Sequence, residues 1–180
     1  MRETLIEPET QFVSLADNLN ITASKRSSPD DFDFLVGKWK VYNKKLAARL
    51  NDCDDWTEFE TVCECRKILN GCGNIDTYRT EFDGVPFEEM TVRIFNPATG
   101  LWSIYWADTN RFVLDVPVVG SFDGDSGCFY ARDEWEEREV ILKFLWNKAN
   151  PETPIWKQAF SADEGKSWEW NRQMIFYRQS

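Results

Sequence analysis

From residue 33 to the end of the chain, apolar and polar residues alternate in short runs and rarely follow helical spacing. Alternation places successive side chains on opposite faces, which is typical of half-buried strands. The runs are rich in aromatic and β-branched residues, and most are separated by Gly, Pro, Asn or Asp. The predicted strands are residues 34–46, 57–68, 74–82, 90–95, 102–108, 112–122, 128–135, 140–148, 155–161 and 168–178.

About ten strands joined by short turns, without crossover helices, favour antiparallel neighbours. Such a sheet either stacks on a second sheet or closes on itself. Closure removes the exposed edges, and a barrel of roughly eight to ten strands has room for one small ligand. The pattern therefore predicts an all-β protein, an antiparallel up-and-down β-barrel over residues 32–178. A β-sandwich is the alternative.

Residues 1–31 have a different composition and predict an N-terminal arm that is partly helical or flexible. Phe12, Leu15, Ala16 and Leu19 recur at the spacing of a short amphipathic helix. A helix of two turns is not stable alone, so we expect it to dock on the barrel or on a second copy in a homodimer. The only helical competitor inside the barrel is residues 44–50, which are strong helix formers.

The overall composition excludes several classes of function. Lys and Arg number 21 against 31 Asp and Glu, for a net charge of −10. An acidic chain is a poor partner for nucleic acid or for an anionic membrane, so neither is expected. The sequence contains no His. Catalysis by Ser-His-Asp or Cys-His, and His-ligated zinc or haem, are thereby excluded.

The five cysteines show no Cys-x-x-Cys pair, which disfavours a zinc site. Cys63 and Cys65 are two residues apart in a predicted strand and share one face, as small buried apolar side chains do. We expect no metal and no cofactor. The N-terminal sequence lacks the features of a signal peptide, and no apolar run is long enough for a membrane helix. We therefore expect a cytoplasmic protein.

The segment Asp31-Phe-Asp-Phe-Leu-Val-Gly-Lys-Trp39 resembles the opening of lipocalin-like, or calycin, barrels. In those proteins a Gly-x-Trp places the indole across one end of the barrel. The chain more closely resembles a group of uncharacterised bacterial lipocalin-like proteins over residues 31–178. The segments that carry this resemblance are residues 34–39, 95–106, 117–122 and 158–163. It implies a barrel with a binding cup and no particular activity.

Residues Ser161-Ala-Asp-Glu-Gly-Lys-Ser-Trp168 match the Asp-box pattern found in sialidase propellers. The Asp and Ser side chains of such a box hydrogen-bond to the backbone of their own turn. A propeller needs several blades, and this sequence has a single box. A β-hairpin turn is therefore favoured over a glycosidase site.

Alternation also predicts which polar side chains face the barrel interior. An interior Arg93 with Asp76, Asp133 or Glu169 would be either a structural ion pair or part of a cup that orients a ligand. For the last predicted strand, either face could point inward. The residues predicted to contact a ligand are Arg93, Tyr105, Asp133, Trp146, Trp156, Gln158 and Asn171.

These patterns predict a protein that binds one small, partly apolar or aromatic molecule in the barrel cup. The alternative is a cofactor-independent isomerase, cyclase or lyase that uses the same cup. Without His, its acid and base would be carboxylates or Tyr, and burial would raise the pKa of such a carboxylate. The candidates for those roles are Asp76, Asp133, Glu169 and Tyr105.

Overall fold

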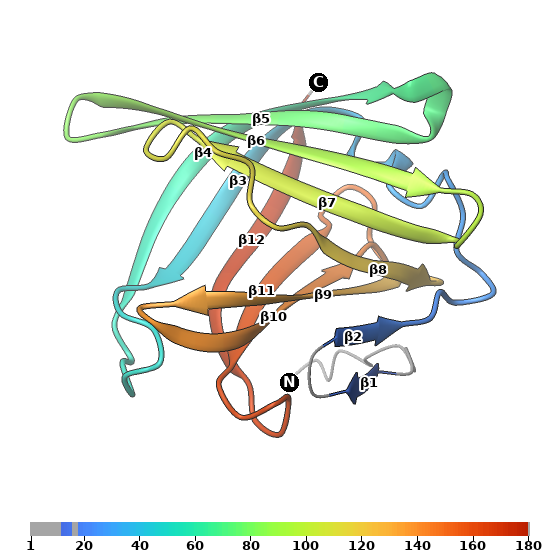
Figure 1. Ribbon diagram of the computed structural model, residues 1–180. Helices are drawn as coiled ribbons and strands as arrows, with labels where there is room; N and C mark the ends of the chain where they lie inside the picture. The colour runs from blue at the N-terminus through green and yellow to red at the C-terminus, as the bar shows by residue number, and fades with distance from the viewer. Residues whose placement is uncertain (1–11, 16–17, 180) are drawn as a thin grey trace.

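The computed structural model describes residues 12–15 and 18–179, in which ten antiparallel strands close into one barrel (Figure 1). The barrel order is β10-β11-β12-β3-β4-β5-β6-β7-β8-β9, and β9 pairs with β10 to complete the ring. The strands are β3 (Gly37–Leu46), β4 (Trp56–Ile68), β5 (Gly73–Phe82), β6 (Val85–Asn96), β7 (Leu101–Asp108), β8 (Val118–Asp123), β9 (Ser126–Trp135), β10 (Arg138–Asn147), β11 (Ile155–Ser161) and β12 (Glu169–Gln179). Two short 3-10 helices, η1 (Asp33–Leu35) and η2 (Leu69–Gly71), complete this part of the chain.

The predicted barrel is confirmed, and most of its strands lie within a few residues of their predicted bounds. Two strands differ. β6 begins at Val85 because the Asp83-Gly84 turn returns the chain directly from β5. β8 begins only at Val118, and residues 112–117 form a loop with strongly exposed apolar side chains.

The predicted N-terminal helix is wrong. Residues 12–21 instead contain two short paired strands, β1 (Phe12–Leu15) and β2 (Asn18–Ile21). Ala16, part of the predicted helical stripe, lies outside the described residues. Leu19 and Ile21 pack on an apolar patch on the outer surface of β9 and β10, which explains why strand pairing prevails over a marginal helix.

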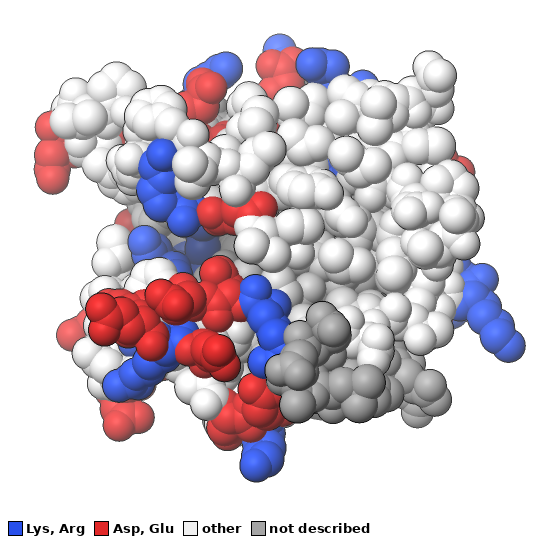
Figure 2. All heavy atoms as spheres, in the orientation of Figure 1, with Lys and Arg blue, Asp and Glu red and all other residues white. Residues whose placement is uncertain are grey.

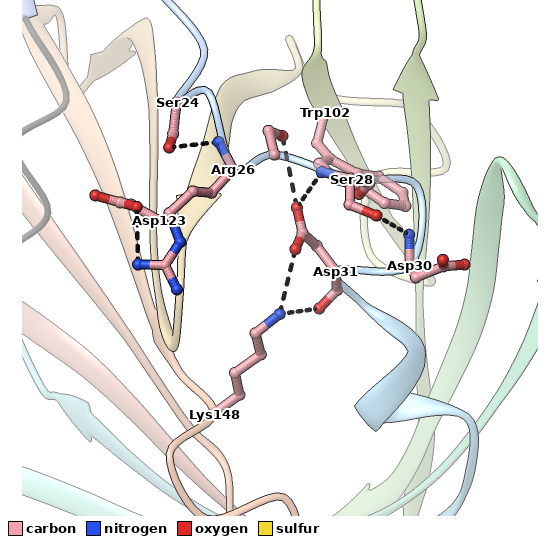
Figure 3. A network of polar contacts seen from close by, with 9 residues as sticks. Ser24, Arg26, Ser28, Asp30, Asp31, Trp102, Asp123 and Lys148 are labelled. Atoms are coloured by element: carbon pink, nitrogen blue, oxygen red, sulfur yellow. Dashed lines mark hydrogen bonds and ion pairs between the residues drawn. The ribbon is translucent and has the colours of Figure 1, made fainter.

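Residues 22–36 cross one end of the barrel, which we call the base (Figure 3). The Ser24 backbone N–H donates to Ser121 Oγ at 2.9 Å. Lys148 Nζ donates to the Asp31 carbonyl at 2.9 Å and contacts its carboxylate at 3.3 Å. The Trp102 indole donates to the Ser28 carbonyl at 3.2 Å. These bonds hold the segment against β7, β8 and the residue that follows β10, so that it closes the base.

The Gly-x-Trp sequence also lies at the base. The Trp39 indole is buried and donates to the Leu35 carbonyl at 2.7 Å. The Arg178 guanidinium stacks 4.1 Å from the centroid of the Trp39 ring and donates to the carbonyls of Phe34 and Val36. Gly37 has φ +124, and a Cβ there would approach Arg178 to 3.1 Å. Glycine at this position therefore permits both the backbone turn and the stacked arginine.

The Asp-box segment forms the predicted turn between β11 and β12. The Asp163 carboxylate accepts bonds from the Ser167 hydroxyl at 2.6 Å, the Ser167 N–H at 2.9 Å and the Ser161 hydroxyl at 2.8 Å. These bonds, led by that of the Ser167 side chain, lower the pKa of Asp163 from 3.8 to about 2. The Ser161, Asp163 and Ser167 side chains, which made the segment resemble an enzyme site, therefore hydrogen-bond within the turn itself.

We expect Ser167→Ala to raise the pKa of Asp163 toward its ordinary value in a carbon-13 NMR titration. Because the folded-state pKa is depressed, the contribution of Asp163 to stability is present above pH 3.8 and is lost as pH falls through about 2. In the Ser167→Ala variant this contribution is smaller, and its loss is complete at a higher pH, because the folded-state pKa lies closer to 3.8. Thr99→Ala, in the turn between β6 and β7, is the control and leaves Asp163 unchanged. An unaltered Asp163 titration in Ser167→Ala would contradict this account.

Candidate functional site

The end of the barrel opposite the base is open and leads into a cavity of about 460 Å³. That volume lies within the range of roughly 300–1,000 Å³ that is common for small-molecule sites. We call this opening the mouth. The loops and turns around it are residues 47–55, 83–84, 109–117, 136–137 and 162–168. Figure 2 shows the molecule hollowed at this end, with basic side chains inside the recess.

Aromatic residues fill the base and thereby determine how deep the cavity reaches. Phe32 packs edge-to-face against Trp102 and Phe122, with ring centroids 5.0 and 4.9 Å apart. Trp146 also packs edge-to-face against Phe32, with ring centroids 5.8 Å apart, and lines the cavity. The cup therefore ends on a packed aromatic layer.

A buried ion pair lies at the floor of the cup. The Arg93 guanidinium, from β6, binds the Asp76 carboxylate of β5 and donates to Asn74 Oδ1 at 2.9 Å. The side chains of Arg93 and Asp76 are 3% and 0% exposed. Burial, the largest single influence, lowers the pKa of Arg93, but the Asp76 charge, the neighbouring Tyr78 and Cys65 and the Asp76 hydrogen bond together raise it above its ordinary value. The guanidinium also lies 5.2 Å from the Phe32 ring centroid, so the pair rests on the aromatic base.

Apolar side chains from β7, β10, β11 and β12 form much of the wall above this floor. Phe144 and Trp156 pack edge-to-face with their centroids 4.8 Å apart. The cavity-lining apolar residues of these strands are Ile104, Trp106, Leu142, Phe144, Trp146, Trp156, Phe160 and Met174. This wall gives an apolar or aromatic ligand extensive contact.

A β-bulge in β12 brings an amide network to the cavity wall. Gln158 of β11 pairs with Arg172, whereas the next residue, Ala159, pairs with Trp170, which leaves Asn171 as the extra residue. The Asn171 side chain is buried and accepts a bond from Gln158 Nε2 at 2.9 Å. The bulge reverses the alternation, so that Trp170 packs on the outer surface while Arg172 lines the cavity.

Basic residues gather at one side of the mouth. Arg172 donates to both carboxylate oxygens of Glu89 at 3.1 and 3.4 Å. Arg49, in the loop after β3, stacks 4.6 Å from the Trp135 ring centroid and 5.2 Å from that of Phe160. Lys45, near the end of β3, lines the cavity and remains exposed.

Acidic residues line the other side of the mouth. Arg111 binds both carboxylate oxygens of Asp115 at 2.7 Å. Asp108 accepts bonds from the backbone N–H groups of Asn110 and Arg111 at 2.8 and 2.9 Å. Asp133, which also lines the cavity, accepts a bond from the Glu134 N–H at 2.8 Å. These carboxylates are bonded within their own loop or strand, and in the described part of the chain none of them forms an ion pair with Lys45, Arg49 or Arg172.

The structure brings five of the predicted ligand contacts to the cavity: Arg93, Asp133, Trp146, Trp156 and Gln158. Asn171 lies behind Gln158. Tyr105 does not line the cavity, because Ile104 and Trp106 hold the inward positions of β7. Sequence reasoning missed Lys45, Arg49, Glu89 and Arg172. The signal for Lys45 was its place two residues after Asn43 and four after Val41, on the inward face of β3.

Of the four residues proposed for catalysis, Asp133 alone lines the cavity. Asp76 is bound by Arg93 beneath the floor. Burial raises the pKa of Asp76, while Arg93 acts in the opposite direction. Glu169 accepts the Leu50 N–H at 2.8 Å and thereby fixes the loop after β3. The proposed acid–base set is therefore not assembled around one point in the cup.

Cys63 and Cys65 of β4 are both buried and belong to the hydrophobic core inside the barrel. Burial raises the pKa of both thiols, to about 12 for Cys65. Within residues 12–15 and 18–179, no group of three or more Cys, His, Asp or Glu is placed to hold a metal ion. The same residues include no helix with the length and apolar character needed to cross a membrane.

The sequence matches no known family and no curated protein. Among solved structures, the chain is similar to the crystal structure of Rv2717c from M. tuberculosis, with 14% sequence identity and a TM-score of 0.53. The alignment covers 83% of this chain and 98% of that one. At this identity the similarity extends to the fold alone.

Proposed function

We propose that the protein binds one small, partly apolar or aromatic molecule in the barrel cup. The observation that carries this proposal is an open cavity of about 460 Å³ lined by aromatic side chains and a few convergent polar groups. A barrel of this size is usually filled by its own side chains unless it holds a ligand. Here the base is filled in that way, and the half toward the mouth is not.

We also propose membership in the lipocalin-like group that the sequence resembles. The stacked Trp39 and Arg178 at the closed base and the ten-stranded ring support this assignment. The alternative of acid–base catalysis lacks comparable support, because the candidate residues Asp76, Glu169 and Tyr105 lie away from the cavity surface. Binding is therefore the function that the geometry supports best.

The test uses the uncharged fluorescent probe N-phenyl-1-naphthylamine. We expect it to bind the purified protein at one site and to quench tryptophan emission, since Trp106, Trp146 and Trp156 line the cup. Val118→Trp places an indole in the cavity and should weaken binding about tenfold or more, because the probe and the new side chain compete for the same volume.

Val62→Trp makes the same exchange on the outer surface of β4, where Val62 is 60% exposed, and should leave binding unchanged. Met174→Trp, which fills the cup from another strand, provides a second blocking variant in case Val118→Trp folds poorly. Equal probe binding by all three variants, or no binding by the wild-type protein, would refute the proposed function.

A further inference from the structure

We infer that the ligand carries an anionic group, such as a carboxylate, sulfonate or phosphate, which Lys45, Arg49 and Arg172 bind at the mouth. This inference rests on the proposed function and assigns the charge and orientation of its ligand. We call these three residues the basic cluster. All three line the cavity.

The strand register brings two of these cations together. Lys45 of β3 and Arg172 of β12 are direct cross-strand partners, and both line the cavity. Like charges directly opposite each other on an antiparallel pair are unfavourable. A site that juxtaposes them is stabilised by a shared anion. Arg49 follows four residues after Lys45 and adds a third positive charge.

The protein itself supplies too few anions for the basic cluster. Two carboxylates face these three cations. Glu89 pairs with Arg172, and Glu169 accepts the Leu50 N–H through Oε2 and acts on Arg49 by its charge without forming an ion pair with it. Within the described part of the chain, no carboxylate lies at ion-pair distance from Lys45 or Arg49. The Nε atoms of Arg49 and Arg172 are buried there without a hydrogen-bond partner, which is costly for a charged donor.

The pKa shifts agree with this excess of positive charge. Burial and then the neighbouring Arg172 lower the pKa of Arg49 to about 10, although the Glu169 charge acts in the opposite direction. Partial desolvation in the cavity lowers the pKa of Lys45, and the charges of Arg49 and Arg172 lower it too, while the charges of Glu89 and Asp108 act in the opposite direction. A bound anion would reverse these effects, so binding and protonation of the cluster favour each other.

The geometry also predicts how the bound ligand is oriented in the cup. Arg49 is oriented by its stacking on Trp135 and Phe160, and Arg172 by Glu89 and by its position 5.5 Å from the Trp156 ring centroid. Oriented guanidinium groups bind carboxylate or phosphate oxygens in pairs. The apolar wall lies between this cluster and the base. An amphipathic ligand would therefore enter with its apolar part first and leave its anionic group at the mouth.

Two probes that differ by one sulfonate test the inference: 1-anilinonaphthalene-8-sulfonate and the uncharged N-phenyl-1-naphthylamine. Exchanging Lys45 and Arg49 together for Gln should weaken binding of the sulfonate probe about tenfold or more, because hydrogen bonds to charged groups are lost. Binding of the uncharged probe should change less than about twofold. Arg172 is retained in this variant because its removal would leave Glu89 buried and unpaired.

The control variant exchanges Lys44 and Arg66 for Gln, which removes the same charge from outward positions on β3 and β4. It should leave both probes unaffected. In one outcome, Val118→Trp weakens binding of the uncharged probe, but the Lys45/Arg49 variant binds the sulfonate probe as tightly as the wild-type protein does. The basic cluster is then not an anion site, and the binding function stands. If Val118→Trp weakens the binding of neither probe, the proposed binding function fails, and this inference fails with it.

Discussion

Replacing Arg93 with Met will lower the free energy of unfolding by about 3–5 kcal/mol at neutral pH, because it removes one partner of a fully buried ion pair. Asp76 is 0% exposed and receives its counter-charge from Arg93. Asn74 Oδ1 also loses a donor. Met has a volume similar to that of Arg, so the lower free energy of unfolding results from the unpaired Asp76 carboxylate and not from a cavity. Urea unfolding followed by tryptophan fluorescence measures it.

The pH dependence of the variant identifies this cause. Without Arg93, burial raises the folded-state pKa of Asp76 above its ordinary value of 3.8. The folded state then binds a proton that the unfolded state releases, so stability falls as pH rises from that value toward the raised pKa. The deficit relative to the wild-type protein is therefore smallest in mild acid and largest at neutral pH.

Two further variants complete the test of the buried pair. Adding Asp76→Asn to Arg93→Met should recover part of the loss at neutral pH, since no buried charge remains. Arg79→Met breaks an exposed pair with Glu88 between the same two strands and should cost less than about 1 kcal/mol. Equal losses in Arg93→Met and Arg79→Met, without pH dependence, would contradict a structural role for the buried pair.

Alternation along the sequence was sufficient to predict the barrel and much of its interior. Where a strand is regular, as in β10 and β11, the inward face follows from one buried aromatic residue. Alternation fails at the bulge in β12, because one extra residue moves Arg172 to the face opposite Trp170. A bulge depends on pairing with a neighbouring strand, so a single strand's pattern does not reveal it.

The basic cluster was missed for a related reason. The predicted strand ended at residue 46, as β3 does, but residues 44–50 are strong helix formers, and their local preference concealed that the chain after Leu46 is a loop held by the Glu169 carboxylate. The predicted N-terminal helix failed in the same way, since its apolar residues find a strand partner and the outer surface of the barrel. In both places contacts with residues more than 100 positions away helped to override local propensity: Leu50 with Glu169, and Leu19 and Ile21 with the outer surface of β9 and β10.

Phe32 closes the base of the barrel although it belongs to no strand. It is 1% exposed and contacts four aromatic rings of β7, β8, β9 and β10. Its position depends on the bonds that Ser28 and Asp31 make with Trp102 and Lys148 (Figure 3). Phe32 is therefore the side chain through which residues 22–36 contribute to the core.

Phe32→Ala should lower the free energy of unfolding by about 3–5 kcal/mol, because it leaves a cavity among rings that cannot collapse around it. Acrylamide should also quench tryptophan emission more strongly, since Trp102 and Trp146 lose their cover. Phe112→Ala, at a position that is 79% exposed in the loop at the mouth, should change stability by less than about 0.5 kcal/mol. If Phe32→Ala lowered the free energy of unfolding as little as Phe112→Ala does, residues 22–36 would contribute little to the core. The residues of the strands alone would then have to close the base of the barrel.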